Sequence, residues 1–207
     1  MATTVDALLP LSFLEAVRAA DRPDEDPDAE FVAELRNKRL GLSDTVHAQI
    51  RRYAEAQRRR QRTGTDEVGA LARLIGRRPD AEVVFRWAGR WWAEGAYAAL
   101  PRTTRRMVRA LPGLVGRPLA LRQVRRLARR YFGGTVRRVG GSLVLEVPAP
   151  LTEATGGTAA GQAGCAYYET GFRELLRLLV AAGGRVEHVR CAARGEGGCQ
   201  WRADWRG

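Results

Sequence analysis

The three cysteines are the residues of this chain with the clearest capacity for chemistry. Cys165, Cys191 and Cys199 all lie after residue 160. An odd number of thiols without a recognisable secretory signal argues against a disulfide framework, which leaves metal binding, catalysis or burial. Cys191 and Cys199 flank a glycine-rich turn, and Cys165 opens a helix expected to pack on that hairpin. The spacing therefore suits one zinc ion; the alternative is three buried cysteines acting as small hydrophobic side chains.

Two segments that contain these cysteines resemble a known family. They are GCAYYETGFRELL at 164–176 and VEHVRCAARGEGGCQWR at 186–202. They are similar to the 4-vinyl reductase domain over about residues 140–205. The shared features are a cysteine that opens a helix, aromatic residues after it, a strand ending in a second cysteine, a glycine turn and a third cysteine. That family includes bacteriochlorophyll 4-vinyl reductase and the sensor domains of aromatic-responsive transcriptional activators. The resemblance implies a ligand-binding fold like that of TRAPP vesicle-tethering subunits and haem nitric-oxide sensors.

The resemblance also implies a set of metal ligands. In the aromatic-sensing relatives, three matching cysteines and one upstream glutamate bind zinc. Carried over, the cysteine ligands are Cys165, Cys191 and Cys199. The family glutamate falls near Gly140, which has no side chain to bind a metal, so Glu146 on the next strand is the expected fourth ligand.

The fourth ligand has alternatives. Strand alternation places residues 187, 189 and 191 on one face, which makes Glu187 a second candidate. His188 then points the opposite way and ranks below both glutamates. A site with three protein ligands and one water, and a site that is not used, remain open.

The resemblance further implies a hydrophobic ligand pocket between the helices and the sheet. The candidate lining residues are aromatic: Trp91, Trp92, Tyr131, Phe132, Tyr168 and Phe172. The expected ligand is a tetrapyrrole pigment precursor, an aromatic compound or a fatty-acid-like chain. Apolar stripes at helical spacing also arise from ordinary core packing, which is the alternative for these residues.

The elements that would position these residues follow from the periodicity of the chain. Helical spacing predicts helices over 8–20, where Ser12 and Glu15 have the spacing of a capping box, and then from Ser43, Thr65 and Asp80, over 103–111 and over 121–131. Gly113, Gly116 and Pro118 are expected to break the chain between the last two. After Gly133-Gly134 the pattern predicts a hairpin (135–148), a flexible loop (155–164), a long helix (165–182) and a second hairpin (185–205).

This order predicts an α+β fold. N-terminal helices are expected to pack with a C-terminal antiparallel sheet, in the order strand-strand-helix-strand-strand. Three parts are expected: an N-terminal helix and acidic linker (1–31), a helical part (32–134) and a zinc-stapled part (135–207) that forms one compact domain with 32–134.

Charge indicates a further kind of partner. The net charge is +12, and Lys38 is the only lysine. Five arginines on one face of the helix at 119–131 suit contact with nucleic acid or an anionic membrane surface, whereas the composition alone is also typical of a GC-rich genome. Specific reading of DNA is not expected, because no helix-turn-helix signature accompanies them.

The sequence therefore predicts a cytoplasmic sensor or carrier, expected to be a homodimer, that binds a hydrophobic small molecule and contains structural zinc. The N-terminus has no basic region of a secretory signal, and no apolar stretch approaches the roughly 20 residues of a membrane helix. No catalytic residues are predicted, because catalytic pairings and nucleotide fingerprints are absent from the sequence. His47 as a haem ligand is a weaker interpretation. The alternative functions are a bacteriochlorophyll-pathway 4-vinyl reductase or its accessory protein, and a basic adaptor.

Overall fold

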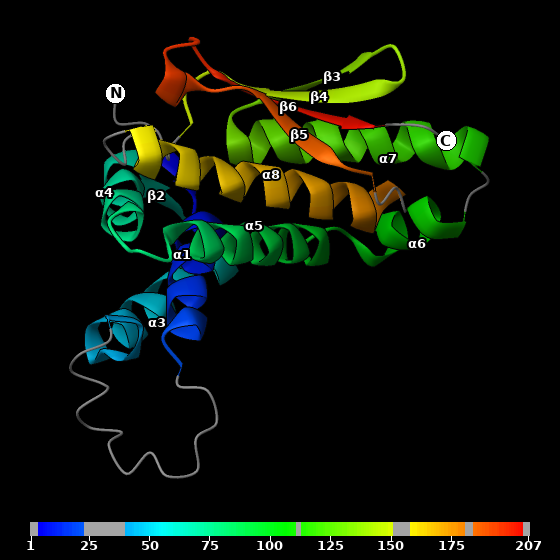
Figure 1. The fold of residues 1–207 in the computed structure, drawn as a ribbon. Coiled ribbons are helices and arrows are strands. Elements are labelled where there is room, and N and C mark those ends of the chain that lie inside the picture. Colours follow the sequence, from blue (N-terminus) through cyan, green and yellow to red (C-terminus); the bar gives the residue numbers. More distant parts are fainter. Residues whose placement is uncertain (1–3, 23–39, 111–112, 151–157, 181–183, 205–207) are drawn as a thin grey trace.

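The computed structural model describes residues 4–22, 40–110, 113–150, 158–180 and 184–204, and these form helices with antiparallel sheets (Figure 1). The α+β class predicted from the sequence is therefore confirmed. Most of the predicted acidic linker, and the boundary expected between residues 31 and 32, lie outside the described residues. None of the described helices is both long enough and apolar enough to cross a lipid bilayer.

The first half of the chain is helical, as predicted. Its elements are α1 (Leu8–Ala20), a short 3₁₀ turn η1 (Leu40–Leu42), α3 (Asp44–Arg58), α4 (Thr65–Gly76) and α5 (Ala81–Ala98). Ser43 caps α3 as expected, because its hydroxyl accepts a hydrogen bond from the backbone N–H of Val46 at 3.3 Å.

The cap predicted for α1 is wrong. Ser12 lies inside the helix, where its hydroxyl donates to the carbonyl of Leu9 at 2.7 Å. The helix begins earlier, and a carboxylate oxygen of Asp6 accepts from the backbone N–H of Leu8 at 3.1 Å. Pro10 permits this start because the first turn of a helix has no intrahelical partner for its N–H groups.

The chain break expected at Gly113–Pro118 is also wrong. After α6 (Arg102–Ala110), α7 spans Gly113–Leu127 with Pro118 inside it, and a π-helical turn, η2 (Ala128–Phe132), follows. Proline near the start of a helix removes one backbone hydrogen bond. Burial of Ala120, Val124 and Leu127 stabilises the helix against that loss.

The C-terminal part contains the expected sheet. Its strands are β3 (Thr135–Val139), β4 (Ser142–Val147), β5 (Val186–Arg190) and β6 (Cys199–Asp204), in the antiparallel order β3-β4-β6-β5. A short 3₁₀ turn, η4 (Ala192–Arg194), follows β5. The sequence did not predict the two-stranded pair of β1 (Thr4–Asp6) and β2 (Arg62–Gly64).

The helix between the two hairpins, α8, spans Thr158–Val180. The loop predicted for 155–164 is therefore wrong from Thr158 onward, and Ala163 packs against the core. α8 lies between the sheet on one side and α5 on the other, with α1 beyond α5 (Figure 1). Gly89 of α5 and Gly171 of α8 let these two helices approach closely, because a Cβ built on Gly89 would lie 2.3 Å from the carbonyl oxygen of Tyr167.

Candidate metal centre

Three cysteines and one histidine meet where α8 packs on the β5–β6 hairpin. Cys165 is the eighth residue of α8 and does not open the helix as expected, because the helix begins at Thr158. His188 lies in β5, Cys191 just after β5, and Cys199 at the start of β6. One potential ligand atom from each of the four side chains lies within 4.8 Å of the other three. The cysteines are 0–4% exposed. The structure thus forms a compact group of Cys and His side chains that could hold a metal ion.

An irregularity in β5 brings His188 into this group. His188 pairs with Trp201 of β6, but Arg190 pairs with Gln200, so two steps along β5 match one step along β6. A bulge of this kind interrupts the alternation of side chains. His188 and Cys191, which regular alternation would place on opposite faces, therefore reach the same site.

The distances between the sulfur atoms fit a tetrahedral metal ion. The Sγ of Cys165 lies 3.8 Å from that of Cys191 and 3.7 Å from that of Cys199. Two sulfurs bound tetrahedrally to zinc at about 2.3 Å are about 3.8 Å apart. In addition, the Nε2 atom of His188 is buried and has no hydrogen-bond partner in the described part of the chain. The donor set and the geometry therefore both suit zinc.

The thiols are electrostatically coupled. Hydrogen bonding with Cys165, aided by His188 and by the backbone N–H of Ala192, holds the pKa of Cys199 well below its usual range. The same contact with Cys199, together with burial, raises the pKa of Cys165. The N–H of Ala192 donates to the Sγ of Cys199 at 3.3 Å. Cys199 thus has the surroundings of a thiolate, which is the form of cysteine that binds metals.

The turn between the last two cysteines is braced by Glu196. Its carboxylate accepts from the backbone N–H of Cys191 at 2.6 Å and from the guanidinium of Arg194 at 3.1 Å. Hydrogen bonding from Arg194 also lowers the pKa of Glu196. Gly195 and Gly197 have positive φ, which permits the tight turn. This brace, which the sequence analysis did not identify, fixes the backbone on both sides of the site.

The glutamates expected as fourth ligands lie in other contacts. Glu146 forms an ion pair with Arg137 at 2.6 Å, on the neighbouring strand of the sheet. Glu187 pairs with Arg185 at 3.3 Å. The group of potential ligands contains neither of them and has His188 in the fourth position. The spacing His-x-x-Cys between His188 and Cys191 is the sequence signal for this residue, and it requires the bulge. His47, a half-buried residue of α3, also lies outside the group.

The aromatic residues predicted to line a pocket pack against one another. Five of the six are 0–6% exposed: Trp92, Tyr131, Phe132, Tyr168 and Phe172. Trp92 lies 4.1 Å from Phe132 between ring centroids, and Tyr168 stacks on Trp201 at 5.2 Å. Trp91 is partly buried and contacts the exposed Trp87. In the state described, these side chains form core packing, and Nε1 of Trp92 and Nε1 of Trp201 have no hydrogen-bond partner among the described residues.

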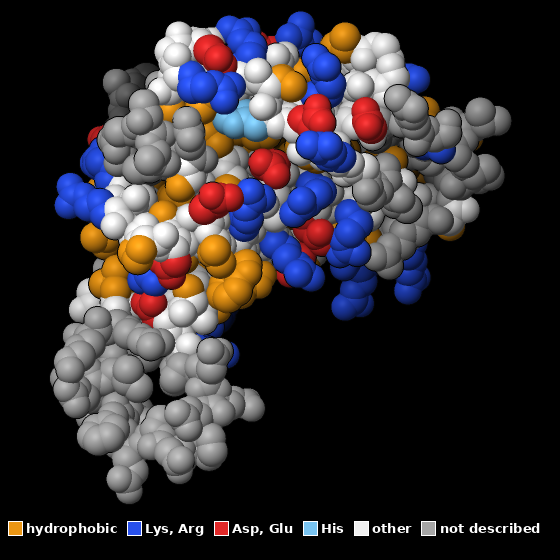
Figure 2. All heavy atoms as spheres, viewed as in Figure 1, with side chains coloured by type: hydrophobic (Ala, Val, Ile, Leu, Met, Phe, Trp, Pro, Cys, Tyr) orange, Lys and Arg blue, Asp and Glu red, His pale blue; other side chains and the backbone are white. Residues whose placement is uncertain are grey.

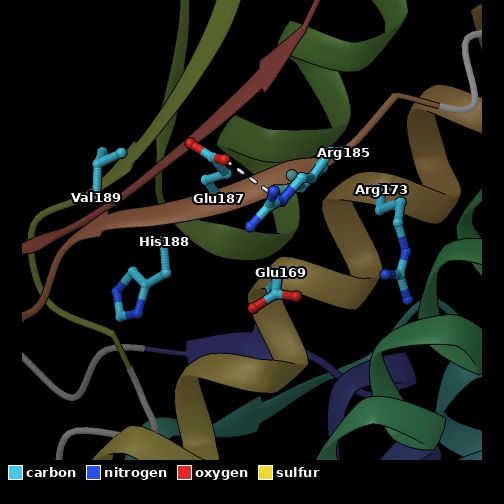
Figure 3. Close-up of a pocket in the computed structure, with 7 residues that line it drawn as sticks. Glu169, Arg173, Arg185, Glu187, His188 and Val189 are labelled. Carbon is cyan, nitrogen blue, oxygen red and sulfur yellow. Dashed lines mark ion pairs between the residues drawn. The ribbon is translucent and has the colours of Figure 1, made fainter.

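A cavity of about 540 Å³ opens beside the metal-ligand group (Figure 3). Glu169 and Arg173 of α8 border it, and Glu187, His188 and Val189 of β5 lie opposite them. Its lining is predominantly charged, unlike the aromatic lining expected from the sequence. His188 therefore connects the metal-ligand group to solvent-accessible space.

Comparisons with known proteins assign no relative to the chain. No protein-family model matches the sequence, and a search of curated proteins found no significant match.

Proposed function

We propose that the chain is a small-molecule-binding domain, similar to the 4-vinyl reductase domain, in which one zinc ion staples the β5–β6 hairpin to α8. The observation that carries this proposal is the convergence of Cys165, Cys191, Cys199 and His188 within 4.8 Å. Three thiolates and one imidazole are a standard ligand set for structural zinc.

The role of the zinc follows from the elements that it would join. Four protein ligands leave no open position for substrate or water, which is typical of structural rather than catalytic sites. The ligands come from α8, from β5 and the residue after it, and from β6, so the ion would cross-link segments distant in the sequence. The free energy of metal binding would then contribute directly to the stability of this part of the fold.

The ligand proposed for this domain is a hydrophobic or aromatic small molecule. The supporting observation is the aromatic group around Trp92, Phe132 and Tyr168. Two buried donors in this group, Nε1 of Trp92 and Nε1 of Trp201, have no partner among the residues that the structure describes. A buried donor without an acceptor costs free energy that a bound ligand can recover. Mostly apolar surroundings with a few polar groups are typical of small-molecule sites.

Native mass spectrometry of freshly purified, untagged protein, compared with the denatured sample, tests both parts. We expect an excess mass of one zinc ion, which is lost in Cys191→Ser. The control is Ala193→Ser, which introduces the same serine side chain on the adjoining turn and should retain the zinc. A ligand would add a further mass that denaturation releases. A bare polypeptide mass with three reactive thiols would contradict the zinc assignment. Absence of Trp fluorescence quenching by a panel of porphyrins, phenols and fatty acids would contradict the ligand assignment.

A further inference from the structure

The net positive charge of the chain arises from one segment. Residues 95–145 contain twelve arginines and no acidic residue. The remaining 23 basic residues equal the 23 acidic residues of the rest of the chain in number, so the whole formal charge of +12 arises from this segment. A GC-rich composition explains arginine in place of lysine, but it does not explain this segregation. On the face that Figure 2 shows, by contrast, acidic and basic side chains are interspersed.

The segment forms α6, α7, η2 and β3, where most of its arginines are exposed. These are Arg102, Arg106, Arg117, Arg122, Arg125, Arg126, Arg129, Arg130, Arg137 and Arg138. Among the described residues, two of these ten form ion pairs: Arg130 with Asp6 and Arg137 with Glu146. Within the part of the chain that the structure describes, most of this charge is therefore not neutralised by ion pairs.

The arginines of α7 and the start of η2 form a stripe. Arg122, Arg125, Arg126 and Arg129 have the spacing of one helix face, opposite the buried Ala120, Val124 and Leu127. The guanidinium of Arg125 also donates to the carbonyl of Val136 in β3 at 3.2 Å. This contact joins the stripe to the edge strand that carries the exposed Arg137 and Arg138. α6 packs against α7, and α7 packs against β3, so the three arginine-bearing elements are neighbours in the fold.

Exposed aliphatic side chains accompany the arginines. Val115, Val139 and Met107 are 57%, 57% and 52% exposed, the highest values among the large hydrophobic side chains described as exposed. All three lie in the basic segment. Val115 precedes Arg122 by seven residues, which places it on the same face of α7. Arginines mixed with exposed aliphatic groups are typical of a surface that contacts both lipid headgroups and the acyl region below them.

We propose that α6, α7 and β3 form a docking surface for an anionic phospholipid bilayer. The arginines would bind lipid phosphates, and Val115 and Met107 would insert below the headgroups. The burial of the aromatic rings in this segment favours a bilayer over nucleic acid as the partner. Tyr97, Tyr131 and Phe132 are at most 8% exposed, so they provide no platform on which bases could stack. This proposal does not depend on the metal centre or on the ligand.

Flotation with vesicles tests the proposal on the full chain. Vesicles of phosphatidylcholine alone are compared with vesicles that contain about one third phosphatidylglycerol, at low and at physiological ionic strength. We expect binding to the anionic vesicles that weakens with salt. Replacing Arg122, Arg126 and Arg129 by glutamine should reduce the partition coefficient about a hundredfold, at roughly fivefold per arginine near the surface. Arg51→Gln, Arg58→Gln and Arg73→Gln together change the net charge equally and should preserve at least half of the binding.

A second pair of substitutions separates the bilayer from nucleic acid. Met107→Ser with Val115→Ser should weaken vesicle binding about tenfold or more, because their insertion is lost while the charge is retained. Circular dichroism confirms that each variant is folded. Absence of binding to anionic vesicles, or equal losses in the two arginine triples, overturns the proposal. Binding to a short DNA duplex that exceeds vesicle binding and that the serine pair leaves unchanged also overturns it, in favour of nucleic acid.

Discussion

The imidazole of His188 lies flat against the indole of Trp201, with ring centroids 4.9 Å apart and planes 11° from parallel. The two residues are direct partners across β5 and β6. Trp201 is fully buried, and Cys199 lies two residues before it on the same face of β6. The indole therefore fixes the plane of the imidazole next to the thiols, although it has no atom that could bind the metal.

Replacing Trp201 by leucine should weaken zinc binding about tenfold. Loss of a group that orients a metal ligand typically lowers metal affinity by about 10- to 100-fold, and this substitution should fall at the lower end of that range. The matched control is Trp92→Leu, since Trp92 is equally buried but lies outside the metal-ligand group. Competition with a chromophoric chelator measures the affinity of each folded variant. An equal loss of affinity in both variants would show that Trp201 acts only through general stability.

His188→Ala should reduce zinc affinity by at least about a hundredfold, because it removes a direct ligand. Glu146→Gln and Glu187→Gln should change it by less than about twofold, since both glutamates are engaged in ion pairs outside the group. The visible absorption of the Co²⁺-substituted protein provides a second readout. A tetrahedral Cys₃His spectrum that Glu146→Gln alters and His188→Ala does not would restore the glutamate as the fourth ligand.

The difference between Glu146 and His188 shows where sequence reasoning about this site ends. The types and order of the elements were sufficient to predict that three cysteines converge, because Cys191 and Cys199 lie at the ends of adjacent strands and Cys165 lies on the helix that packs on them. The fourth position depended on strand alternation, which holds only for a regular strand. The register shift between His188 and Arg190 breaks that rule. Neither residue carries a propensity for a bulge that the sequence alone would reveal.

The fold was predictable to a similar degree. Periodicity located most of the described helices and the four main strands, because one face of each is buried. Local rules were misleading where tertiary packing compensated for a poor local sequence: Pro118 lies inside α7, and the glycine-rich segment becomes helical from Thr158. The pairing of β1 with β2 joins residues about 58 positions apart, as in the contact of Thr4 with Arg62. A three-residue strand has too short a pattern to indicate such a pairing.

Removal of the metal should loosen one end of the fold selectively. At a free zinc concentration about a thousandfold above the dissociation constant, binding adds about 4 kcal/mol to the free energy of unfolding. Treatment with a strong chelator should therefore lower the melting temperature by about 10 °C. Hydrogen exchange should accelerate at the start of α8 and in β6, and it should remain unchanged in α3. Uniform acceleration throughout the chain, or none, would be inconsistent with a staple at this hairpin.

Gly89→Ala should destabilise the contact between α5 and α8 by about 3 kcal/mol. The new Cβ would lie 2.3 Å from the carbonyl oxygen of Tyr167 and 2.9 Å from the backbone nitrogen of Gly171, and neither backbone atom can move without displacing α8. Gly64→Ala is the control, because its Cβ would meet no atom within 4 Å and its φ of −62° suits alanine. Urea unfolding should show a change below about 1 kcal/mol for the control. Equal losses in the two variants would contradict a steric origin.

Arg78 joins the end of α1 to the start of α5, and its contribution to stability should depend on pH. Its guanidinium donates to the buried Asp21 at 2.6 Å and to Asp80 at 2.8 Å. The hydrogen bond from Arg78 lowers the pKa of Asp80 in the folded protein. Asp80 therefore stabilises the fold above its unfolded pKa of about 3.9, and this contribution is lost as the pH falls through the lower, folded pKa.

Arg78→Met should consequently reduce the free energy of unfolding by about 2–3 kcal/mol at neutral pH, because it leaves the buried carboxylate of Asp21 without this cation. The difference from the unsubstituted protein should shrink below about pH 4, as the pH falls toward the lowered pKa of Asp80 and protonation of that carboxylate removes its ion pair with Arg78. Arg90→Met removes a solvent-exposed pair with Glu94 and should cost less than about 1 kcal/mol at any pH. Urea unfolding across this pH range measures both variants. A loss for Arg78→Met that does not vary with pH would assign its role to packing of the arginine stem rather than to its charge.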